Sequence, residues 1–98
     1  MIIITGSAAA RDDTFDELRR LCVEHTQRSR LEPGCLSHDV YVDTENPQRL
    51  FFVETWADRA AVDAHFAVPA SGAFVRAAAK LTTEPPAIQI YDAERTRA

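Results

Sequence analysis

Two strand patterns that meet across a short polar loop constrain the fold of this chain most strongly. From Cys35 to Asp43 apolar and polar side chains alternate, and from Leu50 to Trp56 apolar residues occupy both faces of a second strand. The segment 44–48 between them is polar and suits a hairpin loop. A strand that is apolar on both faces indicates a sheet with helices on one face and a partner on the other.

A first strand and a helix are expected ahead of this hairpin. The β-branched run 2–4 predicts a strand that ends near 6–7, and a loop is expected over 8–13. Thr14 and Glu17 have the spacing of a capping box at the start of a helix. Helical spacing then relates the positions Phe15, Leu18, Leu21, Cys22 and His25.

Further helices and a last strand are expected after the hairpin. Asp58 is a good N-cap for a short helix through Phe66, with Val62, His65 and Phe66 facing inward. Pro69 can open a second helical stretch as its first residue. The prolines at 85–86 end this stretch, and 87–91 reads as the last strand.

The resulting order, β-α-β-β-α-β, is the ferredoxin-like pattern of the α+β class, an antiparallel sheet with helices on one face. The open face would carry Tyr41, Phe51 and Val53, so we expect a homodimer in which two sheets pack face to face. The length predicts a single domain over 1–98, with a charged and frayed tail over 92–98.

Charge and composition argue against several classes of partner. A formal net charge of −4 gives no electrostatic reason to bind nucleic acid or an acidic membrane. No apolar run approaches transmembrane length, and the apolar start is too short for a signal peptide. Cys22 and Cys35 do not make a disulfide framework, so a reduced, cytoplasmic location is expected.

Glu54 and His38 form the first candidate pair. Glu54 lies on an otherwise apolar strand face and needs a partner if it is buried. If the hairpin register sets Val42 opposite Leu50, then His38 falls opposite Glu54 on the same face. Such a pair can orient a substrate hydroxyl, or it can be structural only.

The remaining histidines and the single tryptophan allow two interpretations each. His65 is the best candidate for a base, because an ordinary histidine titrates near neutral pH, but it can also be a structural helix residue. Trp56 can stack on a planar ring or simply fill the core. His25 is expected on the surface or edge of its helix. The three histidines look too scattered in the sequence for a metal site, and none is predicted.

Four segments of the chain resemble the antibiotic biosynthesis monooxygenase family. They are E-P-G-C-L from Glu32, V-E-T-W-A-D from Val53, A-A-V-D-A-H-F from Ala60 and A-V-P-A-S-G-A-F from Ala67. The resemblance implies a ferredoxin-like dimer whose two sheets form an α+β barrel, with a hydrophobic pocket between each sheet and its helices. Family activities include cofactor-independent oxygenation of quinols and anthrones, isomerisation of a phosphorylated sugar derivative, and haem degradation in one branch.

The match is uneven at the level of single residues. Glu54 and Trp56 match the E-x-W motif of the family, and His65 matches its helical histidine. The chain has Ala-Ser at 70–71 where many relatives have a second histidine followed by phenylalanine. It has His38 where an aromatic residue, commonly tyrosine, is frequent. The last helix holds no histidine in its second half, so iron-porphyrin chemistry is not expected.

Together the residues and the resemblance predict a monooxygenase that oxidises a reduced quinone or polycyclic phenol with O₂ and uses no cofactor. His65 would be the catalytic base or hydrogen-bond partner. The expected substrate-binding residues are Trp56, His38, Glu54, Phe52, Phe66 and Phe74. Two alternatives stay open: an isomerase of a small hydroxyketone-type metabolite, for which no O₂ is needed, and a non-catalytic dimeric protein that binds a small ligand.

Overall fold

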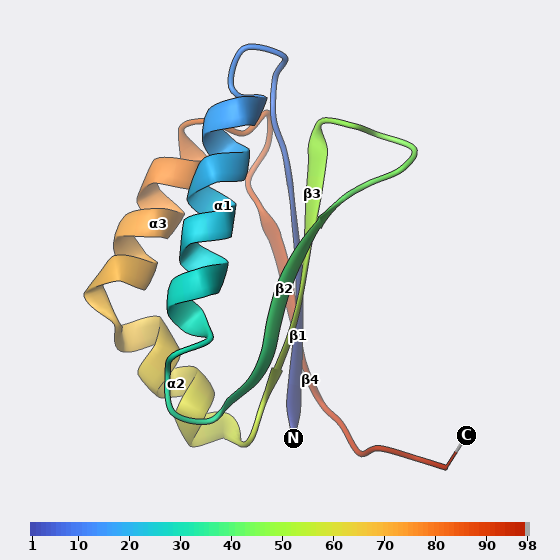
Figure 1. Cartoon of the computed structure of the whole chain (residues 1–98), viewed down its shortest axis with the longest axis vertical. Helices are drawn as coiled ribbons and strands as arrows, with labels where there is room; N and C mark the ends of the chain where they lie inside the picture. Colours follow the sequence, from blue (N-terminus) through green and yellow to red (C-terminus); the bar gives the residue numbers. More distant parts are fainter. Residues whose placement is uncertain (98) are drawn as a thin grey trace.

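The computed structural model describes residues 1–97 and consists of helices packed on one face of an antiparallel sheet (Figure 1). The elements are β1 (Ile2–Ala9), α1 (Phe15–Ser29), β2 (Cys35–Val42), β3 (Arg49–Trp56), α2 (Arg59–Ala67), α3 (Pro69–Ala79) and β4 (Ala87–Asp92). The strand order in the sheet is β2-β3-β1-β4. This is the ferredoxin-like α+β arrangement that the element order predicted. No helix of residues 1–97 is long and apolar enough to cross a membrane.

The hairpin register is the one that the alternation predicted. Val42 pairs with Leu50, and His38 pairs with Glu54 across β2 and β3. The alternation breaks at the start of β2, where the register shifts between Cys35 and Ser37. The residue in this irregular stretch is Leu36, which is 60% exposed instead of sharing the inner face.

Two predictions near the chain start are wrong. β1 continues to Ala9 because its last residues pair with the start of β3, so the expected loop begins later. Thr14 forms no capping box with Glu17, since its side chain makes no cap hydrogen bond. Instead Thr14 Oγ1 accepts the Arg11 N–H at 3.0 Å and donates to the Leu81 carbonyl at 2.7 Å. The hydroxyl thus fastens the start of α1 to the segment after α3.

The end of the chain is held more firmly than the sequence indicated. β4 runs to Asp92, one residue beyond its expected end. Ala93 N–H then donates to the Met1 carbonyl at 2.9 Å, and the Met1 amine donates to the Ala93 carbonyl at 3.1 Å. The expected frayed tail therefore begins no earlier than residue 94, and Ala98 lies outside the described residues.

Two groups of buried side chains fill the space between helices and sheet. One contains Ala8, Ala10, Leu18, Cys22, Leu50, Phe52 and Ala78. The other contains Ile2, Ile4, Trp56 and Val62, with Val62 contributed by α2. All residues of β4 are exposed, so the inner face beside this edge strand is not closed by a helix. This opening gives access to the candidate site.

The outer face of the sheet carries aromatic side chains and no covering element among residues 1–97. Tyr41 is 57% exposed and lies opposite Phe51 on the neighbouring strand. Tyr91 on β4 is 47% exposed and lies opposite Ile3. An apolar sheet face of this kind is a candidate contact surface.

Candidate functional site

A cavity of about 500 Å³ lies between the inner face of the sheet and the helices. Its wall is mainly apolar and includes the predicted residues Phe52, Phe66 and Phe74, with Phe66 at the rim because it is 45% exposed. His25, Glu54 and His65 reach the wall from three different elements, and Cys22 and Arg76 also border the cavity. An apolar chamber with a few convergent polar groups is typical of a small-molecule site.

His65 is held by a carboxylate that the sequence did not single out. His65 Nδ1–H donates to Glu32 Oε1 at 2.9 Å, across 33 residues of sequence. The His65 side chain is almost fully buried, with 4% exposure, and Glu32 is 18% exposed. Because a neutral imidazole that donates from Nδ1 keeps a lone pair on Nε2, this bond gives His65 the tautomer of a general base.

The Glu-Pro-Gly turn positions α2 so that this bond can form. Gly34 has φ +83°, and a Cβ at this position would lie only 2.5 Å from Ala61 Cβ. The glycine therefore allows the turn to lie directly against the first turn of α2. Asp58 begins the helix as predicted, because its carboxylate accepts the Ala61 N–H at 2.9 Å. His65 follows two turns after Asp58, beside Glu32.

Glu54 is in contact with His38, its predicted partner, and also with Trp56. Trp56 Nε1–H donates to Glu54 Oε1 at 3.0 Å, and His38 Nε2 lies 3.3 Å from the same oxygen. Burial raises the pKa of the Glu54 carboxyl, but the interactions with His38 and Trp56 outweigh burial, so its pKa is below the ordinary value. Glu54 is therefore an ionised carboxylate that is 7% exposed at the cavity wall.

Two of the predicted substrate-binding residues lie behind the wall. Trp56 and His38 are both fully buried and do not line the cavity. Trp56 packs on His65, with ring centroids 4.6 Å apart. Direct contact of these two residues with a substrate stays a prediction, whereas their contacts hold His65 and Glu54 in place.

His25 is not the helix-surface residue that the sequence indicated. It is 6% exposed and stacks on Phe74 with ring centroids 4.2 Å apart and planes at 6°. Arg28 Nη2–H donates to its Nδ1 at 3.3 Å. Burial lowers the pKa of His25 to about 3, helped by the neighbouring His38 and His65, so the ring is neutral at neutral pH. The sequence did contain a signal for this burial, because His25 lies on the apolar face of α1, one turn after Leu21.

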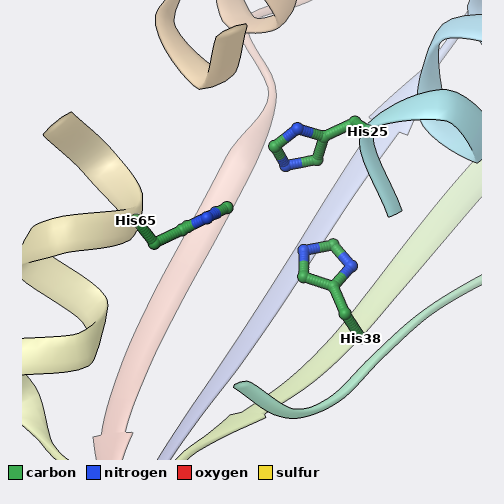
Figure 2. A group of neighbouring side chains, drawn as sticks. All are labelled: His25, His38 and His65. Carbon is green, nitrogen blue, oxygen red and sulfur yellow. The ribbon is translucent and has the colours of Figure 1, made fainter. Parts of the chain in front are cut away.

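The three histidines converge from α1, β2 and α2 (Figure 2). One ring nitrogen from each lies within 4.8 Å of those from the other two. The expectation that the histidines are too scattered to group is therefore wrong, because helix packing joins residues that are far apart in sequence. The Nδ1 atoms already have partners, which are Arg28 for His25, Thr26 for His38 and Glu32 for His65.

Known structures share this arrangement of strands and helices. A Deinococcus radiodurans protein, provisionally named an antibiotic biosynthesis monooxygenase, superposes with a TM-score of 0.95 and 29% identity over 100% of this chain and 97% of that chain. The crystal structure of an antibiotic biosynthesis monooxygenase superposes with a TM-score of 0.88 and 27% identity, over 97% of this chain and 100% of that chain.

Sequence comparison gives the same grouping. An uncharacterized protein of Synechocystis sp. is 33% identical over 96 residues, which is 98% of this chain, and the chain spans 65% of the length of that relative. The family model described as antibiotic biosynthesis monooxygenase matches residues 1–77. Because this match includes both His65 and the E-x-W motif, and most of the chain, the protein belongs to the antibiotic biosynthesis monooxygenase family.

Proposed function

We propose that this protein is a monooxygenase that uses O₂ to oxidise an electron-rich phenol, either a reduced quinone or a polycyclic phenol, without an organic cofactor. The observation that carries the proposal is the pair formed by His65 and Glu32 at an apolar cavity. Family membership supports the oxygenase class. The aromatic side chains Phe52 and Phe74 in the wall support a planar, apolar substrate.

His65 begins the proposed reaction as the base. Its Nε2 takes the proton of a phenolic hydroxyl, and the imidazolium that forms is stabilised by the Glu32 carboxylate on Nδ1. The resulting phenolate donates an electron to O₂ far more readily than the neutral phenol does. This transfer gives one radical derived from O₂ and one on the substrate ring. The apolar wall keeps water away while these two radicals combine.

The substrate supplies all the electrons that reduce O₂, so the reaction balances without another reductant. One oxygen atom forms a bond to a ring carbon, giving a hydroperoxide. The O–O bond then breaks, the ring carbon loses its hydrogen as a proton, and the second oxygen atom leaves as water. A hydroquinone and O₂ thus yield a hydroxyquinone and water.

Glu54 has a second role in this proposal. Its ionised carboxylate lies at the cavity wall, where it can accept a hydrogen bond from another substrate hydroxyl. Trp56 and His38 hold the carboxylate from behind the wall. The substrate would then be oriented between Glu54 and His65, with its ring against the phenylalanines.

We also propose that the protein is a homodimer through the outer face of the sheet. Tyr41 and Tyr91 are about half exposed on this face, and no element of residues 1–97 covers them. Pairing two such faces would bury aromatic surface that a monomer leaves in water.

Oxygen uptake tests the proposal directly. The purified protein is assayed with a panel of benzo- and naphthohydroquinones in the presence of a chelator, and the rate without protein is the baseline for autoxidation. Uptake well above this baseline is expected for wild type. His65→Gln should lose about 100-fold or more of the catalysed rate, as is usual for removal of a general base.

Asp63→Asn is the matched control, because Asp63 lies on the same helix as His65 but is exposed and, among residues 1–97, paired only with Arg59. It should keep the wild-type rate. Uptake at the baseline for every quinol would overturn the oxygenase proposal, and uptake that survives His65→Gln would remove His65 from the mechanism. Turnover of a hydroxyketone without O₂ would favour the isomerase alternative.

A further inference from the structure

The histidine cluster is the part of the site that the proposed base catalysis does not use in full. We propose that His25, His38 and His65 form a site for one late first-row divalent cation, with Zn²⁺ as the probe, and with an open position toward the cavity. This inference goes beyond the proposed function, in which His65 is the only one of the three histidines that reacts with the substrate. It also reverses the expectation from the sequence that the chain holds no metal site.

The hydrogen bonds leave the right nitrogens for a cation. All three Nδ1 atoms contact groups outside the cluster, so the Nε2 atoms are the ones left for its centre. His38 is 0% exposed, and its Nε2 makes no hydrogen bond with good geometry among residues 1–97, although the Glu54 carboxylate lies 3.3 Å away. A bound cation would give this atom a partner.

The nitrogens are already close to ligand spacing. Tetrahedral Zn²⁺ with Zn–N bonds of about 2.0–2.1 Å holds its nitrogens about 3.4 Å apart. One ring nitrogen of each histidine lies within 4.8 Å of those of the other two, so the longest separation has to shrink by up to about 1.4 Å. His25 and His65 border the cavity, where a small rotation of either ring meets open space. Figure 2 shows the three rings directed toward one another from separate elements.

Two of the three rings also have the outer contacts that metal-binding histidines usually show. Such a histidine normally donates its second ring N–H to a carboxylate or another oxygen, which fixes the ring and its tautomer. His65 donates to Glu32 at 2.9 Å, and His38 Nδ1 lies 3.2 Å from Thr26 Oγ1. When Nδ1 carries the proton on both rings, each Nε2 has a lone pair that a cation can bind.

His25 differs, and the difference gives a test. Arg28 donates to His25 Nδ1, which favours the tautomer whose proton is on Nε2. A cation at Nε2 needs the other tautomer, so binding must displace the Arg28 guanidinium from this ring. Arg28 therefore opposes cation binding, whereas Glu32 and Thr26 support it.

The donor set and its surroundings define the class of cation. Imidazole nitrogens favour Zn²⁺, Cu²⁺, Ni²⁺ and Co²⁺ over Mg²⁺ and Ca²⁺, which prefer oxygen ligands. The Glu54 carboxylate is 3.3 Å from His38 Nε2 and offsets part of the positive charge. Because His25 and His65 face the cavity, a fourth coordination position would open onto it, as in zinc sites that bind substrates.

A cation and a substrate proton would compete for the same lone pair of His65. Loaded protein is therefore expected to lose the base-dependent oxygen uptake, and a chelator should restore it. Metal binding is measured without substrate, and oxygen uptake is measured with chelator present. The failure of one proposal is thereby separated from the failure of the other.

Calorimetric titration of untagged, chelator-treated protein with ZnCl₂ is the first test. One Zn²⁺ per chain with a micromolar or tighter Kd is expected. His38→Gln should weaken binding by more than the roughly 10- to 100-fold that the loss of an outer contact costs. The double variant Cys22→Ser with Cys35→Ser is the control for thiol binding and should keep the wild-type Kd.

Substitutions at Thr26 and Arg28, which contact histidine Nδ1 atoms from outside the cluster, should shift the Kd for Zn²⁺ in opposite directions. Thr26→Val removes the oxygen beside His38 Nδ1 and should weaken Zn²⁺ binding about 10- to 100-fold. Arg28→Gln frees His25 Nδ1 and should strengthen it. If Thr26 and Arg28 were only structural, their substitutions would not change the Kd for Zn²⁺ in opposite directions.

Nitrogen NMR of the histidine rings in wild-type protein avoids any dependence on the folding of variants. The chain has only three histidines, and Zn²⁺ should move the Nε2 resonances of all of them. Three results would each overturn the inference: no binding in the micromolar range, an unchanged Kd in His38→Gln, or Nε2 resonances that do not move. Loss of binding only in the cysteine variant would also overturn it.

Discussion

His65 Nδ1 and Glu32 Oε1 are joined by a 2.9 Å hydrogen bond between side chains that are 33 residues apart. Glu32 comes from the turn after α1, and His65 comes from the last part of α2. The bond decides which nitrogen of His65 is directed to the cavity. Both the proposed base and the proposed cation site therefore depend on Glu32, which acts only through its hydrogen bond to His65.

Glu32→Gln tests this positioning role. Glutamine keeps the size and an acceptor oxygen but loses the charge that stabilises the imidazolium. We expect kcat for oxygen uptake to fall by about 10-fold or more, as part of the general-base contribution, with little change in KM. Asp39→Asn, at an exposed carboxylate paired with Arg30, should change neither constant. Full kcat in Glu32→Gln would contradict the role given to the pair.

Gly34→Ala should destabilise the protein strongly. The left-handed backbone at φ +83° disfavours alanine by about 1–2 kcal/mol. The new Cβ would also lie 2.5 Å from Ala61 Cβ, and overpacking of this kind typically adds about 1–3 kcal/mol. The free energy of unfolding, measured in urea, is expected to fall by the sum of these effects.

Gly72→Ala is the matched control for this substitution. Gly72 lies inside α3, its φ is not positive, and a Cβ there would meet only the end of the Arg76 side chain. Alanine should be neutral or stabilising by up to about 1 kcal/mol. Equal losses in the two variants would mean that the contact between the turn and α2 is not the cause.

His25 should make the metal-free protein less stable in mild acid. Burial, with His38 and His65 beside it, lowers its pKa from 6.5 to about 3 in the folded state, and Glu54 and Arg28 act on it in opposite directions. Between these pH values the unfolded chain binds a proton that the folded chain does not. The free energy of unfolding should therefore decrease as pH falls from 6.5, by at most about 1.4 kcal/mol per pH unit.

His25→Phe isolates this effect, because phenylalanine keeps the stacking on Phe74 but cannot be protonated. Urea denaturation is measured with EDTA between pH 6.5 and about 5, where ordinary carboxyl groups are still ionised. The variant should show a smaller slope of stability against pH than wild type. Equal slopes would rule out His25 as the group responsible.

Tyr41→Glu should disrupt the proposed dimer. A carboxylate between two packed sheet faces would be desolvated without a partner. Light scattering after gel filtration should give wild type twice the chain mass of 10.9 kDa and the variant a mass close to that of one chain. Leu31→Glu is the control, because Leu31 is 87% exposed and lies outside the sheet. A monomeric wild type would contradict the proposal.

The sequence predicted the elements and the faces of the strands well, because these depend on local periodicity. Alternation with a period of two residues, together with the loop length, was enough to place His38 opposite Glu54. Proline and aspartate positions predicted the start of α2 and of α3. Local rules failed where a distant residue competed, as at Thr14, whose hydroxyl bonds to Leu81 instead of capping α1.

The sequence by itself therefore determined the strands, the helices and the pairing of β2 with β3. Only the tertiary structure decided the site, since His25, His38 and His65 belong to three elements whose distances depend on how helices cross the sheet. The physical reason is that hydrogen-bond periodicity acts over a few residues, whereas the approach of α2 to the turn at Gly34 is set by side-chain packing across the whole core.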